Sequence, residues 1–422
     1  LPKVHYQKWG NPNFQLTNYE VINKAAYFDY QREKIYLRTN KKVKKAIVKQ
    51  SDNASHNHYD IKINKYLTDY LPAFCPKCSH NQFYRLNEKQ KLVIDIKFTD
   101  NGIKKWVIQI LGNAFQCTNC TEKFAIDKYG RNLKIWFVNQ HIKYLVSMAK
   151  IQKMLLDYFN LWIPYHILSE FKPEIAKEYL TTYKQILESI TSGSLIQIDE
   201  TKSIVKENQN GYVWVFANME SVIYMYRENR ESSFLKDLLN NFNGVLISDF
   251  YKGYESVKCV QQKCLVHLIR DLNNDLLNNQ FNEEYSKIVQ EFGTLLKAII
   301  VTIDKYGLRK RNLNKHKKYT EAFFTHLENK EYSTELANKW KKRLIRNRNK
   351  LFNFLDYNDV PWNNNNAENA IKPFAKYRAF TKGTLREKSL KDYLVLLSIE
   401  QTCKYRGVNF FDFLKSKKHE VF

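Results

Sequence analysis

The spacing of hydrophobic and polar residues changes along the chain, and each change predicts a different kind of element. Between about residues 133 and 190, apolar residues recur every three or four positions, which is typical of amphipathic helices. Proline has no amide hydrogen to donate, so we expect breaks in these helices near Pro164 and Pro173. Several short helices in succession suit a helix-turn-helix-like module, and a helical spacer between two domains is the alternative.

From residue 195 onward the pattern becomes that of short apolar β-strands. Four such runs are separated by turn-forming residues or a short helical segment: LIQIDE, GYVWVFANM, SVIYMYRE and GVLISDF. We expect a fifth strand at VKCVQQ and a helix at the segment KCLVHLIRDLNNDLL, which follows it. Three neighbouring strands, a helix and a further strand predict a layered α/β sheet.

Four of the seven cysteines form two C-x-x-C pairs: Cys75, Cys78, Cys117 and Cys120. The segment between the pairs predicts a β-hairpin around Asp100-Asn101-Gly102, which would bring the second pair back to the first. Four thiolates brought together in this way form a closed, structural Zn²⁺ site, as in a zinc ribbon. Two disulfides or four unrelated thiols are the alternatives, and no signal peptide is recognised that would favour disulfides. We expect Cys259, Cys264 and Cys403 to be core residues.

The composition of the chain predicts the class of partner that it binds. The hydrophobic fraction of 44% indicates a globular protein, while 68 Lys and Arg against 43 Asp and Glu give a formal charge of +25. Such an excess predicts a polyanionic partner, most simply nucleic acid, with an anionic membrane surface as the alternative. No apolar run reaches the length of a membrane span in this chain, which begins at Leu1.

Three acids stand in positions where chemistry is expected. Asp199 and Asp249 end the first and fourth predicted strands, and Glu368 follows the asparagine run in VPWNNNNAENAIKPF, residues 360–374. Asparagines cap helices, so this run is expected to start the helix that presents Glu368. Two acids at neighbouring strand ends and a third from a helix can bind Mg²⁺ or Mn²⁺ through oxygen. Each acid taken singly could instead be a cap or an ion-pair partner.

Four segments together resemble the DDE-class insertion-sequence transposases, most closely the family numbered sixty-six: IDETK, LISDFYKGYES, CLVHLIRDL and VPWNNNNAENAIKPF. The resemblance covers about residues 190–395 and implies an RNase H-like α/β core with a helical insertion before the glutamate. It implies that Asp199, Asp249 and Glu368 are the catalytic, metal-binding acids. Cys264 and His267 match a Cys-x-x-His element with a structural role, and we do not expect them to bind zinc because no second pair lies nearby in sequence.

Some residues depart from the family's pattern. Asn363 stands where the family has an acid, Asp359 lies four positions earlier, and Lys372 replaces an arginine, losing its two-pronged phosphate contact. Pro373 is present, and we expect it to kink or end the helix of Glu368 within a few residues.

The predicted organisation has six parts. They are a basic N-terminal region at 1–70, a zinc-ribbon-like module at 71–128, a helix-turn-helix-like module or spacer at 129–193, the RNase H-like core at 194–277 and 360–395, a helical insertion at 278–359 and a tail at 396–422. Residues just past Glu368 are the first candidates for DNA contact: Lys372, Lys376, Arg378 and Lys382. The basic runs at 41–50, 309–318 and 339–350 are either DNA-tracking or solvated surfaces.

These features predict a transposase that cleaves and joins DNA using two Mg²⁺ or Mn²⁺ ions, with Zn²⁺ as a structural ion. Its expected partners are the terminal inverted repeats, the target DNA and further copies of itself in a synaptic complex, and no membrane. The resemblance implies a prokaryotic, cytoplasmic, nucleoid-associated protein. The alternatives are an RNase H-like nuclease or resolvase without strand transfer, and a domesticated zinc-containing DNA-binding protein without catalysis.

Overall fold

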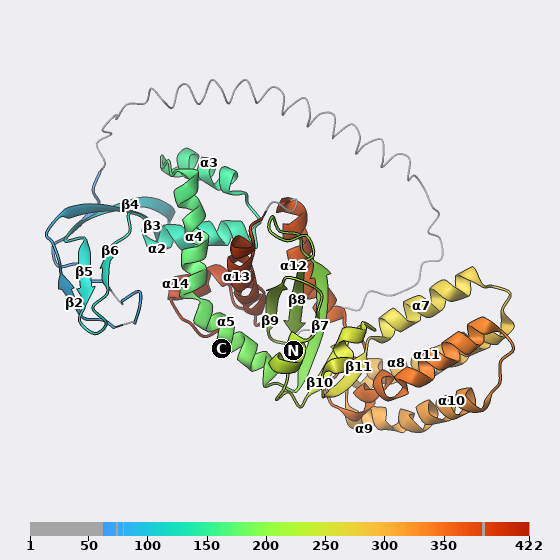
Figure 1. Ribbon diagram of the computed structural model, residues 1–422. Helices are drawn as coiled ribbons and strands as arrows, with labels where there is room; N and C mark the ends of the chain where they lie inside the picture. Colours follow the sequence, from blue (N-terminus) through green and yellow to red (C-terminus); the bar gives the residue numbers. More distant parts are fainter. Residues whose placement is uncertain (1–61, 73–74, 79, 382–384, 422) are drawn as a thin grey trace, which may run out of the picture. The chain divides into compact units, whose positions relative to one another are not determined.

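The computed structural model describes residues 62–72, 75–78, 80–381 and 385–421 (Figure 1). The chain divides into two compact units, Leu1–Ile63 and Asn64–Phe422, and every element named below belongs to the second. The basic run at 41–50 and Lys382 lie outside the described residues. Among those described, no helix combines the length and apolar character needed to cross a membrane.

Two small sheets come first in the described chain. One contains β1 (Lys65–Leu67), β4 (Gly102–Leu111) and β3 (Gln90–Thr99), and the other contains β2 (Phe83–Arg85), β5 (Ala114–Cys117) and β6 (Lys123–Ala125). The predicted hairpin is confirmed: β3 and β4 pair antiparallel up to Thr99 opposite Gly102. Gly102 has a φ of +106°, a conformation that glycine adopts without strain, so the tight turn falls where the sequence places it.

A helical region follows, as its apolar spacing predicts. It consists of α2 (Arg131–Val138), a π-helical turn η1 (Asn139–Lys143), α3 (Met148–Phe159), α4 (Tyr165–Glu178) and α5 (Leu180–Thr191). The predicted break at Pro164 is confirmed, since this residue immediately precedes α4. The predicted break at Pro173 is wrong, because α4 continues through it. Phe171 and Ile175 are buried on either side, so burial holds this helix together across the missing hydrogen bond.

The central sheet has five strands in the order β11-β10-β7-β8-β9. These strands are β7 (Leu195–Lys202), β8 (Tyr212–Ala217), β9 (Val222–Arg227), β10 (Val245–Ser248) and β11 (Val260–Lys263). Strands β7, β8 and β9 form an antiparallel meander, whereas β10 and β11 run parallel to β7. The short helix α6 (Phe234–Leu238) and the 3-10 helix η2 (Lys252–Ser256) lie in its connections. The layered α/β sheet is therefore confirmed.

Two late helices complete this layer. Helix α12 (Asn365–Thr381) contacts β7 and β8, and α13 (Glu387–Tyr405) contacts β9 (Figure 1). The Ser398 and Thr402 hydroxyls of α13 accept hydrogen bonds from the backbone amides of Tyr224 and Val222, so α13 shields this edge strand. The short helix α14 (Phe410–Ser416) follows.

We expected Pro373 to kink or end α12 within a few residues. The expected end is wrong. The helix continues for two further turns, to Thr381. Phe374 and Tyr377 are buried directly after the proline, and the ring of Tyr377 stacks on Tyr393 of α13 with 3.4 Å between centroids. This packing offsets the lost backbone hydrogen bond.

A helical region lies between β11 and α12 in the sequence. Its elements are α7 (Leu265–Asn278), α8 (Glu283–Tyr306), α9 (Lys310–Leu313), η3 (Asn314–His316), α10 (Lys317–Asn329), α11 (Glu335–Leu351) and η4 (Asn353–Asp356). These helices share a second hydrophobic cluster that includes Tyr285 and Trp340, whose rings stack. The cluster also includes Val245 and Ile247 of β10, so the helical region packs against the central sheet.

Candidate active site

Sheet register brings Asp199 and Asp249 together. Parallel pairing sets Ile247 of β10 opposite Gln197 of β7, and the same register continued by two residues sets Asp249 beside Asp199. Neighbouring strands are about 4.8 Å apart, so the two carboxylates emerge next to each other. Asp199 accepts a hydrogen bond from the Glu200 amide at 2.9 Å, and Asp249 accepts one from the Tyr251 amide at 2.8 Å. These local bonds orient both side chains at one end of the parallel strands.

The asparagine run fixes the start of α12 against β7. Asn364 is fully buried, and its side-chain amide donates to the Ile198 carbonyl at 2.8 Å, one residue before Asp199. The Gln197 side chain donates to the Asn363 carbonyl at 3.0 Å. The Asn366 side chain donates to the Asn218 carbonyl and accepts from the Tyr405 hydroxyl. The run starts the helix as expected, and it also ties that start to the sheet.

Glu368 lies one turn into α12, and its amide donates to the Asn364 carbonyl at 3.1 Å. Its side chain is half-buried, and its Oε1 atom has no hydrogen-bond partner within the described chain. Asn364 lies one turn before Glu368 and is bound to Ile198, next to Asp199, so the start of α12 holds Glu368 beside the end of β7. All three acids predicted from sequence therefore converge at one end of the sheet.

The pKa of Asp199 reflects its burial and the acids around it. Burial raises the pKa of Asp199 to about 7, and the negative charges of Glu200, Asp249 and Glu368 act in the same direction. The amide of Glu200 partly opposes the shift. Like charges held this close favour either a bound proton or a bound cation. The group of acids therefore has the electrostatic character of a cation site.

Glu200, next to Asp199 on β7, has a different environment. Its side chain is only 2% exposed and accepts a hydrogen bond from Arg230 Nε at 2.8 Å. The buried Tyr254 hydroxyl donates to its other oxygen. Tyr254 belongs to the segment that follows Asp249, so this contact joins the first two acidic segments. Glu200 is a buried structural anchor, which the sequence alone does not reveal.

A buried lysine lies beside the second acid, and it was not among the candidates predicted from sequence. Lys263 ends β11 and is fully buried; its Nζ atom donates to the Ser248 hydroxyl at 3.1 Å and pairs with Glu255 at 3.3 Å. Burial lowers its pKa to about 8, and the charge of Asp249 opposes this. Strand β11 reads VQQK, which is mostly polar, so no local pattern indicates that this lysine is buried.

The Cys-x-x-His residues lie beside the third acid. His267 Nδ1 is 3.5 Å from Glu368 Oε1, and the amide of Asn364 donates to the Cys264 sulfur at 3.2 Å. Cys264 is fully buried, as expected for a core residue, whereas His267 is half-buried. The starts of α7 and α12 thus meet at the acidic group.

More than half of this chain matches a known protein family. The family model described as Transposase IS66 family matches residues 129–388, more than half of the chain. This chain belongs to the IS66 transposase family. A search of curated proteins finds no match to it. The matched residues include all three acids, the Cys-x-x-His element and the helical region between β11 and α12, whereas the four paired cysteines lie outside them.

In this IS66-family chain, the four paired cysteines gather into one cluster. Their sulfur atoms lie within 4.8 Å of one another. Cys75 Sγ is 3.6 Å from Cys120 Sγ, and Cys78 Sγ is 3.5 Å from Cys117 Sγ. A disulfide would need about 2.05 Å, whereas Zn–S bonds of about 2.3 Å in a tetrahedron put sulfurs about 3.8 Å apart. A hydrogen bond from the His80 amide lowers the pKa of Cys78 to about 6, whereas desolvation and the neighbouring thiols raise the pKa of Cys120 to about 12. The donor set fits zinc.

The predicted DNA-contacting residues of the transposase have different surroundings. Lys372 and Lys376 are exposed on α12, and Lys372 donates to the Asn369 side chain at 2.6 Å. Arg378 instead donates to the Thr201 hydroxyl at 2.8 Å and to the Lys202 carbonyl, so it joins α12 to the end of β7. Arg378 is therefore engaged within the protein.

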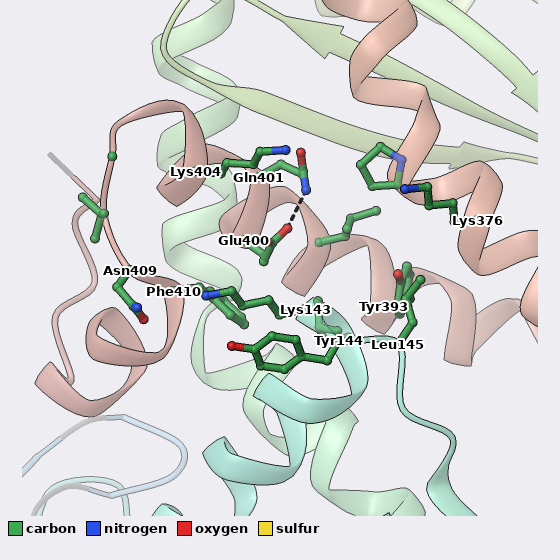
Figure 2. A pocket seen from close by; sticks show the side chains of 15 residues that line it. Lys143, Tyr144, Leu145, Lys376, Tyr393, Glu400, Gln401, Lys404, Asn409 and Phe410 are labelled. Carbon is green, nitrogen blue, oxygen red and sulfur yellow. Dashed lines mark hydrogen bonds between the residues drawn. The ribbon is translucent and has the colours of Figure 1, made fainter. Parts of the chain in front are cut away.

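Lys376 has basic neighbours that sequence reasoning missed. It lines a pocket of about 690 Å³ together with Lys143 and Lys404 (Figure 2). Glu400 is the acid of this pocket; burial raises its pKa, and it accepts a hydrogen bond from Gln401 at 2.6 Å. Three lysines around one buried carboxyl make a surface suited to an anion. Lys143 and Lys404 come from two other segments than Lys376, so the basic run after Glu368 did not indicate them.

Basic side chains of α11 are largely engaged in ion pairs among the helices. The pairs are Lys339–Asp275 at 3.3 Å, Arg343–Asp271 at 2.5 Å and Arg348–Glu328 at 2.9 Å. The run at 339–350 therefore has a structural use, and it is not needed to explain DNA binding.

Proposed function

We propose that this IS66-family chain is a DDE transposase that hydrolyses phosphodiester bonds at the ends of its element and joins them to target DNA. The observation that carries the proposal is the convergence of Asp199, Asp249 and Glu368 at one end of the sheet in a member of a transposase family. The strand order, an antiparallel meander followed by two strands parallel to its first, supports an RNase H-like core.

The three carboxylates would hold the divalent metal. Oxygen donors alone suit Mg²⁺ or Mn²⁺, and the raised pKa of Asp199 favours a cation among them. A bound pair of such ions supplies activation of a water or 3′-hydroxyl and stabilisation of the leaving oxygen. The protein's own part is positioning: Asn364 holds the start of α12 against Ile198, and Tyr254 fixes Glu200 beside the site.

DNA binding is shared among several parts in this proposal. The cysteine cluster, with structural Zn²⁺, and the helices α2–α5 would bind the terminal inverted repeats, while the pocket lysines would contact backbone phosphates. Phosphate contacts position the duplex, and base contacts supply the choice of sequence. Two or more copies would hold the element's ends together in a synaptic complex.

The test is cleavage and joining in solution. Labelled duplexes carrying the element's terminal repeats, incubated with the chain and Mg²⁺ or Mn²⁺, should be nicked at the repeat end and joined to a second duplex. Ca²⁺ should support binding with little chemistry, since it is larger and less strict in geometry. Nicking without joining would favour a nuclease or resolvase, and binding without nicking in any metal would favour a DNA-binding protein without catalysis.

Salt dependence tests the pocket lysines. Replacing Lys143, Lys376 and Lys404 by glutamine should reduce the slope of log affinity against log salt by up to about three, because each lost phosphate contact removes about 0.9. Filter binding or fluorescence anisotropy across a salt series measures this. The matched control replaces Lys415, Lys417 and Lys418, exposed lysines at the C-terminal end. An equal loss of slope in both triple variants would contradict the assignment of the pocket.

The pKa of Asp199 predicts how metal binding depends on pH. A pKa raised to about 7 means that this carboxyl is mostly protonated at pH 6 and mostly ionised at pH 8. A metal must displace that proton, so the apparent affinity for Mn²⁺ should fall by about tenfold from pH 8 to pH 6. Calorimetric titration with Mn²⁺ at both pH values measures the change. Equal affinity at both would show that Asp199 is not a ligand with this pKa.

A further inference from the structure

Two buried polar atoms face each other beside the acidic group at ion-pair distance, and neither makes a hydrogen bond in the described chain. They are His267 Nδ1 and Glu368 Oε1, which lie 3.5 Å apart. The Cys264 sulfur is the third member of this group, and the three ligand atoms lie within 4.8 Å of one another. An ion bound between them would give both atoms a partner and remove the cost of about 1–3 kcal/mol of a buried polar atom without a hydrogen bond.

The spacing favours a metal ion over a direct hydrogen bond. A charge-assisted bond from imidazole to carboxylate would bring nitrogen and oxygen to about 2.7–2.9 Å. Metal bonds of about 2.0–2.1 Å in a tetrahedron hold nitrogen and oxygen ligands about 3.3 Å apart, which is close to the observed separation. In an ideal tetrahedron a sulfur ligand, with a bond of about 2.3 Å, would lie about 3.6 Å from the other two ligands; the three atoms here lie within 4.8 Å of one another.

The fold holds these three residues from two directions. Cys264 immediately precedes α7, and His267 lies in its first turn, one helical turn away. The amide of Leu265 donates to the Trp362 carbonyl at 3.0 Å, and the amide of Asn364 donates to the Cys264 sulfur at 3.2 Å. These contacts join the starts of α7 and α12 across about a hundred residues of sequence, so the ligand group is preorganised.

The chemistry of the donors selects a class of metal. Sulfur, imidazole nitrogen and one carboxylate oxygen suit Zn²⁺ or Co²⁺, whereas Mg²⁺ prefers oxygen. We propose that Cys264, His267 and Glu368 form a second site for a Zn²⁺-class ion, separate from the four-cysteine cluster. Because Glu368 serves both sites, a metal bound here removes it from Asp199 and Asp249. This consequence for cleavage rests on the proposed function, while the binding of metal does not.

Metal stoichiometry tests the site without DNA. The full chain, dialysed against micromolar Zn²⁺ and analysed by mass spectrometry for metal, should hold about two zinc ions per chain. Cys264→Ser and His267→Gln should each hold about one, since the four-cysteine cluster remains. Cys259→Ser, which changes a half-buried cysteine outside both groups, should still hold two. Circular dichroism and thermal melting establish that each variant is folded.

Visible spectra of the Co²⁺-loaded protein give a second measurement. The parent should show a one-thiolate charge-transfer contribution beyond that of the cysteine cluster, and His267→Gln, which keeps the thiol, should lose the accompanying metal. One zinc per parent chain, with unchanged Co²⁺ spectra in folded Cys264→Ser and His267→Gln, would overturn the proposal.

Inhibition then tests the sharing of Glu368. Micromolar Zn²⁺ added to the Mg²⁺-dependent cleavage assay should inhibit the parent. The His267→Gln variant should require a Zn²⁺ concentration at least roughly ten times higher for the same fractional inhibition. Equal sensitivity would show that Zn²⁺ acts elsewhere and would overturn the sharing. If no metal supports cleavage by the parent, the proposed function fails, while the stoichiometry still decides the metal site.

Discussion

Replacing Glu368 with glutamine is expected to reduce Mg²⁺-dependent cleavage of the terminal repeats by about a thousandfold or more. Metal ions stabilise the transition state by several kcal/mol, and each 1.4 kcal/mol is about a factor of ten in rate. An amide supplies the shape of the carboxylate without its charge, so it cannot hold the cation. Asp199→Asn and Asp249→Asn should have losses of the same order. Single-turnover nicking of labelled DNA at saturating Mg²⁺ measures all three.

DNA binding and folding should survive these substitutions. Asn at position 199 can still accept the hydrogen bond from the Glu200 amide, and the tie between Asn364 and Ile198 does not involve the acids. Gel-shift affinity in Ca²⁺ should therefore stay near that of the parent. A loss of binding equal to the loss of cleavage would show that the acids matter for assembly rather than for the reaction.

The pH dependence of thermal stability tests the raised pKa of Asp199 independently of cleavage. Its raised pKa means that the folded protein binds this proton more tightly than the unfolded chain does. Stability therefore falls as pH rises from about 4 to about 7 in the absence of metal. Removing the charge removes that penalty. With a chelator present, Asp199→Asn should melt above the parent at pH 8 and nearer to it at pH 5. The parent melting higher at pH 8 would contradict this.

Asp359→Asn is the matched control for the acidic variants. Asp359 lies just before the asparagine run, but its side chain is 68% exposed and pairs with Arg309 at 3.3 Å. Its φ of +59° is a conformation that asparagine accepts, so the substitution should not strain the backbone. Cleavage by this variant should equal that of the parent. If Glu368→Gln also cleaved like the parent, the active site would have to lie elsewhere.

The acids could be predicted from sequence because their signals are local. A short apolar strand that ends in an aspartate is visible in LIQIDE and GVLISDF, and parallel register then brings Asp199 and Asp249 together. The asparagine run was predicted only as a helix start. Nothing local shows that Asn364 is fully buried and bound to Ile198, because its partner lies in a strand far earlier in the chain.

The failures share one physical cause. Pro173 and Pro373 were expected to interrupt their helices, yet both helices continue because buried side chains on either side outweigh one lost hydrogen bond. The closeness of Cys264 and His267 to Glu368 could not be predicted from sequence, since Glu368 lies about a hundred residues later. Patterns describe neighbours along the chain, whereas these effects depend on contacts between distant segments.

Removing the metal from the four-cysteine cluster should unfold only the small sheet β2-β5-β6 next to it. The sheet β2-β5-β6 is small, with an aromatic group formed by Phe83, Phe115 and Phe124. A unit of this size has too little buried surface to be stable without a metal. Structural zinc contributes about 10–16 kcal/mol of binding free energy in isolated fingers, so its loss should open this sheet.

The neighbouring hairpin should behave differently. Strand β3 is tied to α2: the Leu133 amide donates to Asp95 Oδ1 at 2.7 Å, and the Gly130 amide donates to the Ile94 carbonyl at 2.8 Å. These contacts do not involve the metal. Hydrogen exchange after chelation should therefore rise sharply in β2, β5 and β6, rise less in β3, and stay unchanged in the central sheet.

Single substitutions give the same result without a chelator. Cys75→Ser and Cys120→Ser should each lose the cluster's zinc and most of the affinity for terminal-repeat DNA, because a serine oxygen does not replace the thiolate in a closed tetrahedral site. Cys403→Ser, at a buried cysteine remote in sequence from the cluster, is the control and should keep the metal. Metal analysis of freshly purified protein decides the first point: an absence of zinc from the parent would remove the cluster's structural role. Full affinity in zinc-free but folded Cys120→Ser would instead separate the cluster from DNA recognition.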